Sequence, residues 1–170
     1  MEPDTDELYS MLVPLHQHRL IVPRACVAEV VRQSLSDPLP DEPSWLRGRM
    51  PWLDREIPVI SFEELAGLPF VTPGGRTRVS VFHALGGVLA TGAFGLLSEG
   101  FPQLVRVNRQ VMEPDTRHPW PEDGPIICQI RMINEYPLIP DLERLELLLA
   151  GHLKTGAEVG GSRYYSPRSP

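Results

Sequence analysis

The chain has 170 residues, of which 42% are hydrophobic and 22% charged, and its formal net charge is −6. This composition is typical of a soluble globular protein, and the acidic balance argues against nucleic acid as the main partner because phosphate binding requires clustered cations. A chain of this length buries roughly 70% of the surface that its unfolded form exposes, so it needs no metal or disulfide in order to fold.

The N-terminal extension, residues 1–7, is acidic and lacks both the basic and the apolar region of a secretory signal, so we expect a cytoplasmic protein. Residues 8–15 and 19–22 then predict two strands joined at His16-Gln17-His18, the second ending at Pro23. A short helical turn and a proline-rich polar loop over residues 32–44 follow.

Two further strands are expected near residues 46–52 and 56–61. Pro58 suggests that the second of them lies at a sheet edge, because proline cannot donate to a ladder. A short helix is then expected to begin at Ser61, a residue type that caps helices, and to end at Gly67.

The most apolar segment, residues 79–97, is nearly uncharged and almost long enough to span a bilayer. Gly86-Gly87 at its middle is a tight-turn signal between two β-prone runs. Each glycine would also weaken a helix by about 1 kcal/mol relative to alanine. The pattern therefore favours a buried β-hairpin over a membrane helix.

The C-terminal part predicts a strand over 103–112, a second proline-rich acidic loop over 113–125, and a hairpin that turns at Asn134-Glu135. A helix over 141–153 can be capped by Asp141. The remaining residues, 154–170, are rich in Gly, Ser and Pro, and we expect a disordered tail.

The two halves of the chain repeat one order of elements: a hairpin, a proline- and acid-rich loop, a second hairpin and a short helix. Many short strands with turn signals favour an all-β fold with a few short helices. The repetition predicts two similar small barrels packed side by side. The first would span mainly residues 15–70, and the second mainly residues 75–140 with the helix 141–153.

No combination of residues predicts a catalytic site. His16 and His18 stand at i and i+2 and share one face of a strand, but no third metal ligand lies close in sequence. His83 lies in an apolar strand and is expected to be a hydrogen-bonded core or edge residue. The carboxylates gather in proline-rich loops, where charge is solvated. We therefore expect a non-enzyme without metal or cofactor.

Cysteines and tryptophans are the remaining distinctive side chains. Cys26 and Cys128 lie in apolar runs without a Cys-x-x-Cys pattern, which favours buried free thiols, although a disulfide between them stays open. Trp45 and Trp52 fit core packing and interface anchoring equally well. Trp120, between two prolines in an acidic loop, is expected to be exposed and available for docking.

The stretch "WLRGRMPWLDREIPVISFEELAGL" resembles the core signature of CheW-like chemotaxis coupling proteins. In that family a Trp and a Gly precede a strand, a two-residue turn follows, and the next strand carries Pro-Val-Ile before a short helix. The opening strands and "IRMINEYPLIPDLERLELLL" resemble further parts of the family pattern, so the resemblance covers residues 8–150. Its structural signature falls on Trp45, Gly48, Pro58, Ile60 and Gly67.

The resemblance implies two packed five-stranded, SH3-like β-barrels and a non-catalytic adaptor. Members of the family join a chemoreceptor to the regulatory domain of a chemotaxis-type histidine kinase, without nucleic acid and without membrane insertion. The partner interface carried over from the family comprises Trp52, Leu53, Asp54, Arg55 and Val59.

The turn itself departs from the family pattern. The usual Asn-Leu-Arg-Gly is replaced by Pro51, Trp52, Leu53 and Asp54, and the nearest arginine, Arg55, comes two residues late. This difference puts a receptor contact of the usual kind in doubt. The Trp-rich turn and the "PLIPDLERLE" ending are most similar to the ChpC-like branch, which serves twitching motility by type IV pili.

Two other functions stay open on the sequence. One is a metal- or small-molecule-binding β-barrel enzyme that uses His16, His18 and His83. The other is an acidic binding module of the OB type, which the lack of aromatic residues interleaved with Lys or Arg argues against.

Overall fold

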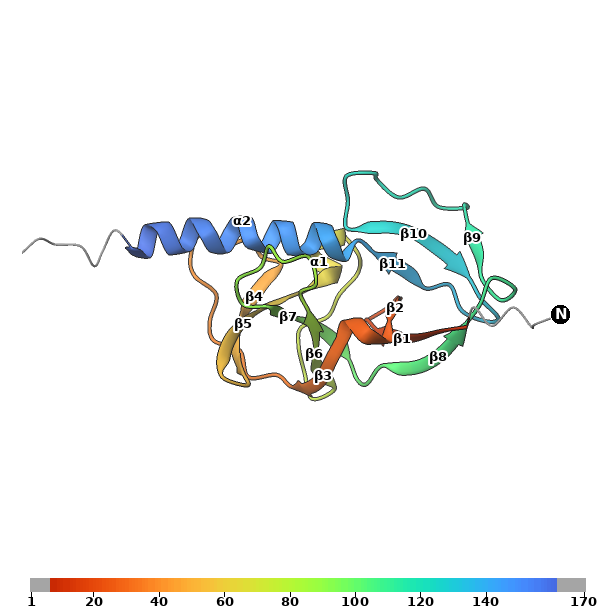
Figure 1. Cartoon of the computed structure of the whole chain (residues 1–170), viewed down its shortest axis with the longest axis horizontal. Helices are drawn as coiled ribbons and strands as arrows, with labels where there is room; N and C mark the ends of the chain where they lie inside the picture. The colour runs from red at the N-terminus through yellow and green to blue at the C-terminus, as the bar shows by residue number, and fades with distance from the viewer. Residues whose placement is uncertain (1–6, 162–170) are drawn as a thin grey trace, which may run out of the picture.

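In the computed structural model, which describes residues 7–161 and side chains through residue 153, eleven strands form two sheets (Figure 1). The expected all-β class with few helices is confirmed. The strands are β1 (Leu8–Pro14), β2 (Arg19–Pro23), β3 (Val27–Arg32), β4 (Leu46–Trp52), β5 (Arg55–Ile60), β6 (Thr77–His83), β7 (Ala93–Glu99), β8 (Gln103–Val107), β9 (Glu113–Asp115), β10 (Ile126–Arg131) and β11 (Leu138–Pro140). The helices are η1 (Arg24–Cys26), α1 (Phe62–Ala66) and α2 (Leu142–Gly161).

The repeat predicted that each half of the chain would form one sheet, but the two sheets do not divide the chain at its middle. One sheet has the order β8-β1-β2-β11-β10-β9, and the other has the order β3-β6-β7-β5-β4. The boundary at residues 70–75 was therefore wrong, since β6 and β7 join the strands before them. The N-terminal hairpin joins the last strands instead, because β1 pairs with β8 from Leu8↔Val107 to Leu12↔Gln103. Each sheet contains one parallel contact, β5 with β7 and β2 with β11.

The five-stranded sheet closes on itself at Gly48. The chain after β3 returns along β4, where Ser36 N donates to Arg49 O at 2.8 Å. Gly48 has φ +142°, and a Cβ there would lie 2.1 Å from the carbonyl oxygen of Ser36. Only glycine permits both this backbone conformation and this approach. The glycine of the structural signature, Gly48, is thus the closure point of the barrel.

Three apolar clusters make up the core. The largest lies between the sheets and the helices and includes Phe62, Phe82, Phe94, Leu138 and Leu149, each at most 1% exposed. A second cluster fills the five-stranded sheet around Ile57 and Val59, and a third fills the six-stranded sheet around Leu12 and Ile130. Helix α2 lies along the molecule and extends past β4 (Figure 1).

Helices α1 and α2 each carry one buried glutamate that accepts a hydrogen bond from a connection between two strands of the other sheet. Glu63 of α1, 6% exposed, accepts a hydrogen bond from the His16 backbone N–H at 3.2 Å, in the β1–β2 turn. Glu146 of α2, 4% exposed, accepts one from Gly86 N–H at 3.0 Å, in the β6–β7 connection. The helices therefore fix how the two sheets pack on each other.

Local predictions near the helices hold in most places. The Ser61 hydroxyl accepts from Glu64 N–H at 3.3 Å and caps α1, which ends at Gly67 with φ +70°. Asp141 accepts from Arg144 N–H at 3.0 Å at the start of α2. The expected end at residue 153 is wrong, because α2 continues to Gly161. Residues 154–159 contain one glycine and no proline, so nothing stops a helix before Gly160-Gly161; residues 162–170 lie outside the described chain.

Three other expectations need correction. Residues 79–97 are the β6–β7 hairpin, but its connection spans 84–92 instead of a tight turn at Gly86-Gly87. The expected loop 113–125 contains β9. Pro58 lies on an inner strand, between β7 and β4, and is compatible with that position because only Val59 and Ile60 enter the β5–β7 ladder. No helix in residues 7–161 is long and apolar enough to cross a membrane.

Candidate interaction surface

The β4–β5 hairpin ends in a two-residue turn that stands out of the barrel. The ladder runs to Trp52↔Arg55, which leaves Leu53 and Asp54 as the turn residues. Leu53 is 74% exposed and has φ +53°. The Asp54 side chain is 85% exposed. The turn thus presents an apolar side chain beside a carboxylate to solvent.

The conformation of Leu53 is unusual for its residue type. Hairpin turns that need a positive φ normally use Gly, Asn or Asp there, because a larger side chain clashes with the backbone. Leucine at this position costs stability twice, through its backbone conformation and through its exposed apolar surface. Such a cost without a structural return is typical of functional sites.

The flanking residues hold the turn in place. Trp52 packs against the cluster inside the barrel, and its Nε1 donates to Glu29 Oε2 of β3 at 3.0 Å. Arg55 Nη1 donates to Thr91 O at 3.0 Å, and Arg55 Nε donates to Asp54 Oδ1 at 3.3 Å. Trp52 and Arg55 therefore support the turn, although Arg55 stays 45% exposed, and Leu53 and Asp54 are its most exposed side chains.

Val59 does not belong to this surface. Its side chain is 0% exposed and lies in the cluster inside the barrel, so the expected partner contact is wrong for this residue. The strand alternation at the end of β5 explains this, because Val59 faces the barrel interior while Ile60 faces the other sheet. Val59 is a core residue next to Gly95, with which it pairs in the parallel ladder.

The other signature residues have structural roles. Trp45 packs against the central core and meets His152 of α2 edge to face, with 5.2 Å between ring centroids. Ile60 is 0% exposed, and Pro58 is buried. Trp120, which we expected to be exposed, is half-buried against the same core, so its docking role loses its main support.

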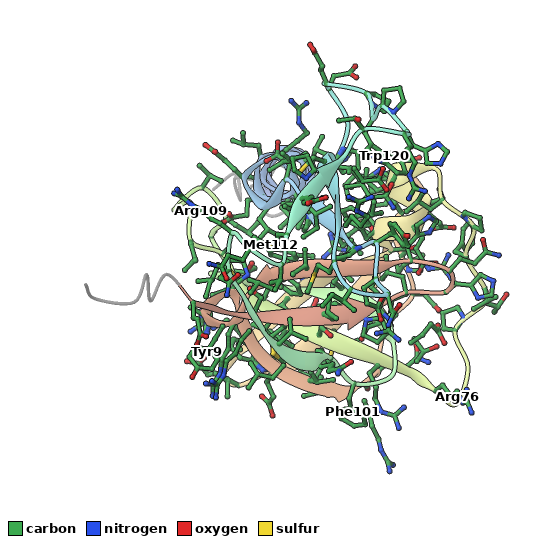
Figure 2. All side chains as sticks on the ribbon, turned by 90° about the vertical axis from the view of Figure 1, so that its right-hand side faces the viewer. Tyr9, Arg76, Phe101, Arg109, Met112 and Trp120 are labelled. Carbon is green, nitrogen blue, oxygen red and sulfur yellow. The ribbon has the colours of Figure 1, made fainter. Side chains whose placement is uncertain are left out.

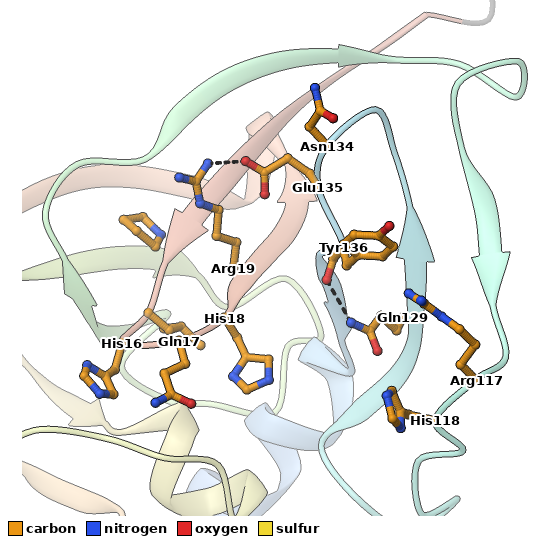
Figure 3. Close-up of a pocket in the computed structure, with 12 residues that line it drawn as sticks. His16, Gln17, His18, Arg19, Arg117, His118, Gln129, Asn134, Glu135 and Tyr136 are labelled. Carbon is orange, nitrogen blue, oxygen red and sulfur yellow. Dashed lines mark hydrogen bonds and ion pairs between the residues drawn. The ribbon is translucent and has the colours of Figure 1, made fainter.

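A polar cleft of about 590 Å³ lies where the β1–β2 and β10–β11 hairpins diverge beyond their single parallel pair, Leu138↔Leu20 (Figure 3). It contains His16 and His18, together with His118 from the β9–β10 connection. Arg19 bridges the hairpins through Glu135 at 2.7 Å. His83 is absent from its lining, since it is exposed at the end of β6.

This cleft does not form the metal or enzyme site that the histidines left open. Within the described part of the chain, no three His, Cys, Asp or Glu side chains are arranged to hold a metal ion. Burial lowers the pKa of His18, which favours the neutral form of its imidazole. Arg117 is bonded to Asp115 and lowers the pKa of that carboxyl to about 2, which makes the pair a fixed ion pair.

Titration elsewhere is governed by burial. Burial raises the pKa of Glu63, and the nearby Glu99 and Glu64 carboxylates raise it further against the opposing His16 hydrogen bond. Burial also raises the pKa of the Cys26 and Cys128 thiols. Both cysteines are free, Cys26 buried and Cys128 half-buried, so no disulfide joins them.

A family model described as the CheW-like domain matches residues 10–146. The chain belongs to the CheW-like domain family. Among solved structures, the scaffolding protein TtCheW from Thermoanaerobacter tengcongensis has the same fold, with a TM-score of 0.66 and 14% identity over 84% of this chain and 90% of that chain. No curated protein matches the chain. CheW-like proteins are non-catalytic scaffolds of chemotaxis signalling, so this member is not an enzyme.

Two features of the CheW-like surface were not found from sequence. Thr91 supports Arg55 from a connection that no local pattern links to the β4–β5 turn. Ile133, 79% exposed beside Asn134 at the β10–β11 turn, gives the second sheet an apolar tip like Leu53. The expected turn at Asn134-Glu135 was the available signal, but it did not show which side chain would be exposed.

Proposed function

We propose that this CheW-like protein is a cytoplasmic adaptor that couples a chemoreceptor to a chemotaxis-type histidine kinase. The observation that carries the proposal is the exposed, positive-φ Leu53 at the tip of the β4–β5 hairpin, in a chain whose family consists of scaffolds. The enzyme and OB-type alternatives have no comparable support. The acidic balance opposes nucleic acid, and His83 of the enzyme hypothesis lies outside the cleft that His16 and His18 line.

The regulatory domain of the kinase is the partner we assign to the turn. The usual turn arginine of the family is replaced, and the guanidinium of Arg55 is already bonded to Thr91 and Asp54. Arg55 is therefore poorly placed to substitute for it in a receptor contact. Leu53 and Asp54 instead offer one apolar and one acidic contact, which suits a partner surface with an apolar pocket and a basic rim.

The output that we propose is twitching motility through type IV pili. Its support is the resemblance of the Trp-rich turn and of "PLIPDLERLE" to the ChpC-like branch. Co-purification from cells with a kinase encoded beside pilus components, and loss of twitching on deletion, would be the expected results. Loss of swimming with normal twitching would contradict this part of the proposal and leave the adaptor function intact.

The experiment that tests the coupling is co-purification of the full chain with the kinase regulatory domain. We expect Asp54→Lys to weaken recovery of the kinase while the melting temperature stays within about 1 °C, because the side chain is exposed and surface substitutions change stability little. Leu147→Ala is the control, since Leu147 is a 54% exposed leucine on α2, away from the turn. If Asp54→Lys and Leu53→Ala each recover as much kinase as wild type does, the assignment of the turn to the kinase is refuted.

A further inference from the structure

Three arginines gather without an acidic partner at one end of the five-stranded sheet. Within residues 7–153, where side chains are described, five arginines form no ion pair, and three of these, Arg32, Arg76 and Arg78, are close together. Arg32 and Arg78 are direct partners in the β3–β6 ladder, and Arg76 lies just before β6. This cluster is unexpected in a chain whose net charge is −6.

The arrangement of these arginines lowers the stability of the folded protein. Residues directly opposite in an antiparallel pair point to the same face, so the Arg32 and Arg78 guanidinium groups share one side of the sheet. Like charges in this position destabilise a sheet. Glu99 of the neighbouring strand β7 pairs with Thr77, one residue before Arg78, and accepts from the Thr77 hydroxyl at 3.3 Å. Strand alternation therefore puts Glu99 on the opposite face.

An exposed aromatic ring completes this surface. Phe101, 68% exposed, follows β7 and lies under the Arg78 guanidinium, 5.6 Å from the ring centroid. Arg78 Nη1 also donates to the carbonyl oxygens of Gly75 at 2.9 Å and Thr77 at 3.0 Å. The Arg78 side chain is thus held in place, whereas Arg32 and Arg76 are exposed. Figure 2 shows Arg76 and Phe101 on the same side of the molecule.

We propose that Arg32, Arg76, Arg78 and Phe101, the arginine–phenylalanine surface, bind an acidic segment of a protein partner. Arginine and aromatic residues are the types enriched where protein interfaces gain most of their affinity. Guanidinium groups pair with carboxylates in a bidentate manner, and the Phe101 ring provides an apolar contact beside them. Three cations on an acidic protein are too few for an anionic membrane or a nucleic acid, which require larger clusters.

This surface is separate from the β4–β5 turn. Arg55 at the turn contacts Thr91, which precedes β7, whereas Phe101 follows the other end of β7. The two surfaces therefore lie at opposite ends of the same strand. A protein that docks on the arginine–phenylalanine surface leaves the turn free, so this inference does not depend on the function proposed for the turn.

The test measures fluorescence anisotropy of a labelled peptide in which glutamate alternates with leucine and phenylalanine, titrated with the full chain at low ionic strength. We expect this peptide to bind more tightly than the same peptide with lysine in place of each glutamate, and added salt to weaken its binding. Arg32→Glu should weaken binding about tenfold or more, as expected for the loss of a close charge pair. Arg24→Glu, the same charge change at another exposed arginine without an ion pair, is the matched control.

A second measurement separates binding from folding. Arg32→Glu places a carboxylate opposite Arg78 in the ladder, so its melting temperature should equal or exceed that of wild type while the peptide affinity falls. Three results would each overturn the proposal. They are equal binding of the acidic and the lysine peptide, equal effects of Arg32→Glu and Arg24→Glu, and preference for phosphatidylglycerol vesicles or a single-stranded oligonucleotide over the acidic peptide.

Discussion

Replacement of Gly48 by alanine tests the closure of the five-stranded barrel. The backbone at Gly48 has φ +142°, a region that is essentially restricted to glycine and costs other residues about 1–3 kcal/mol. The new Cβ would lie 2.1 Å from Ser36 O, a backbone atom that cannot rotate away. Relief of this clash must separate the chain after β3 from β4.

The magnitude follows from the hydrogen bonds that hold this contact. Ser36 N donates to Arg49 O at 2.8 Å, and the Ser36 hydroxyl bonds both the carbonyl and the N–H of Arg49 at 3.1 and 3.3 Å. Each contributes about 0.5–1.5 kcal/mol net. The smaller entropy of the unfolded alanine chain returns about 0.4–1 kcal/mol. The middle values of these contributions lead us to expect that Gly48→Ala lowers the free energy of unfolding by about 4 kcal/mol.

Urea unfolding followed by tryptophan fluorescence measures this loss. Gly74→Ala is the matched control, because a Cβ at Gly74 meets no atom within 4 Å and its φ is not positive. It should change stability by less than about 1 kcal/mol. If Gly48→Ala and Gly74→Ala unfold at the same urea concentration, the closure of the barrel at Gly48 is not as described.

The two buried carboxylates lead to further predictions. The pKa of Glu63 is raised in the folded state, so the folded protein binds this proton more tightly than the unfolded chain does. The contribution of Glu63 to stability is therefore largest at low pH and is lost as pH rises through the raised pKa. Glu63→Gln keeps an acceptor for His16 N–H, so the variant should be at least as stable as wild type at pH 7. Its melting temperature should also fall less than that of wild type as the pH rises above 4.5. A steeper fall in the variant would contradict the raised pKa of Glu63. Glu146→Ala leaves Gly86 N–H without its acceptor and should lower the free energy of unfolding, measured in urea, by about 1–3 kcal/mol. Glu143→Ala, at an exposed position on the same helix, is the control and should lower it little. Equal losses would show that the contact between α2 and the β6–β7 connection contributes nothing to stability.

Elements with a local cause could be predicted from the sequence. The cap at Ser61, the end of α1 at Gly67 and the turn near Asn134 each depend on residues within a few positions, and the structure contains all three. The strands bordered by proline or turn residues were also found, as β1, β2 and β4 show. These features are set by backbone preferences and capping, which neighbouring residues determine.

Features that depend on long-range pairing could not be predicted. The similarity of the two halves suggested a division near residue 70, but the pairing of β1 with β8 is decided by contacts about 95 residues apart, such as Tyr9↔Arg106. The inner position of Pro58 follows from the parallel contact of β5 with β7, which no local pattern encodes. The end of α2 was placed too early because residues 154–170 were treated as one segment rich in Gly, Ser and Pro, although these residues are concentrated after residue 159.

The structure separates the predicted interface residues into exposed and buried ones. The resemblance placed it at the β4–β5 turn, and the structure adds that Leu53 and Asp54 are accessible while Val59 is buried. Hydrophobicity alone could not separate Leu53 from Val59, because both are apolar residues near one hairpin. Their difference arises from the turn conformation and from the curvature of the barrel, which exist only in the folded chain.

The most direct test of the account is the affinity of the kinase regulatory domain for Leu53→Gly, measured by titration calorimetry beside the melting temperature of the same variant. Glycine accepts the positive φ at this position, so the account predicts a variant at least as stable as wild type that binds the kinase at least about tenfold more weakly, the loss expected for removal of an exposed apolar anchor. Wild-type affinity in a stable Leu53→Gly protein would contradict the claim that this hairpin tip is the docking element.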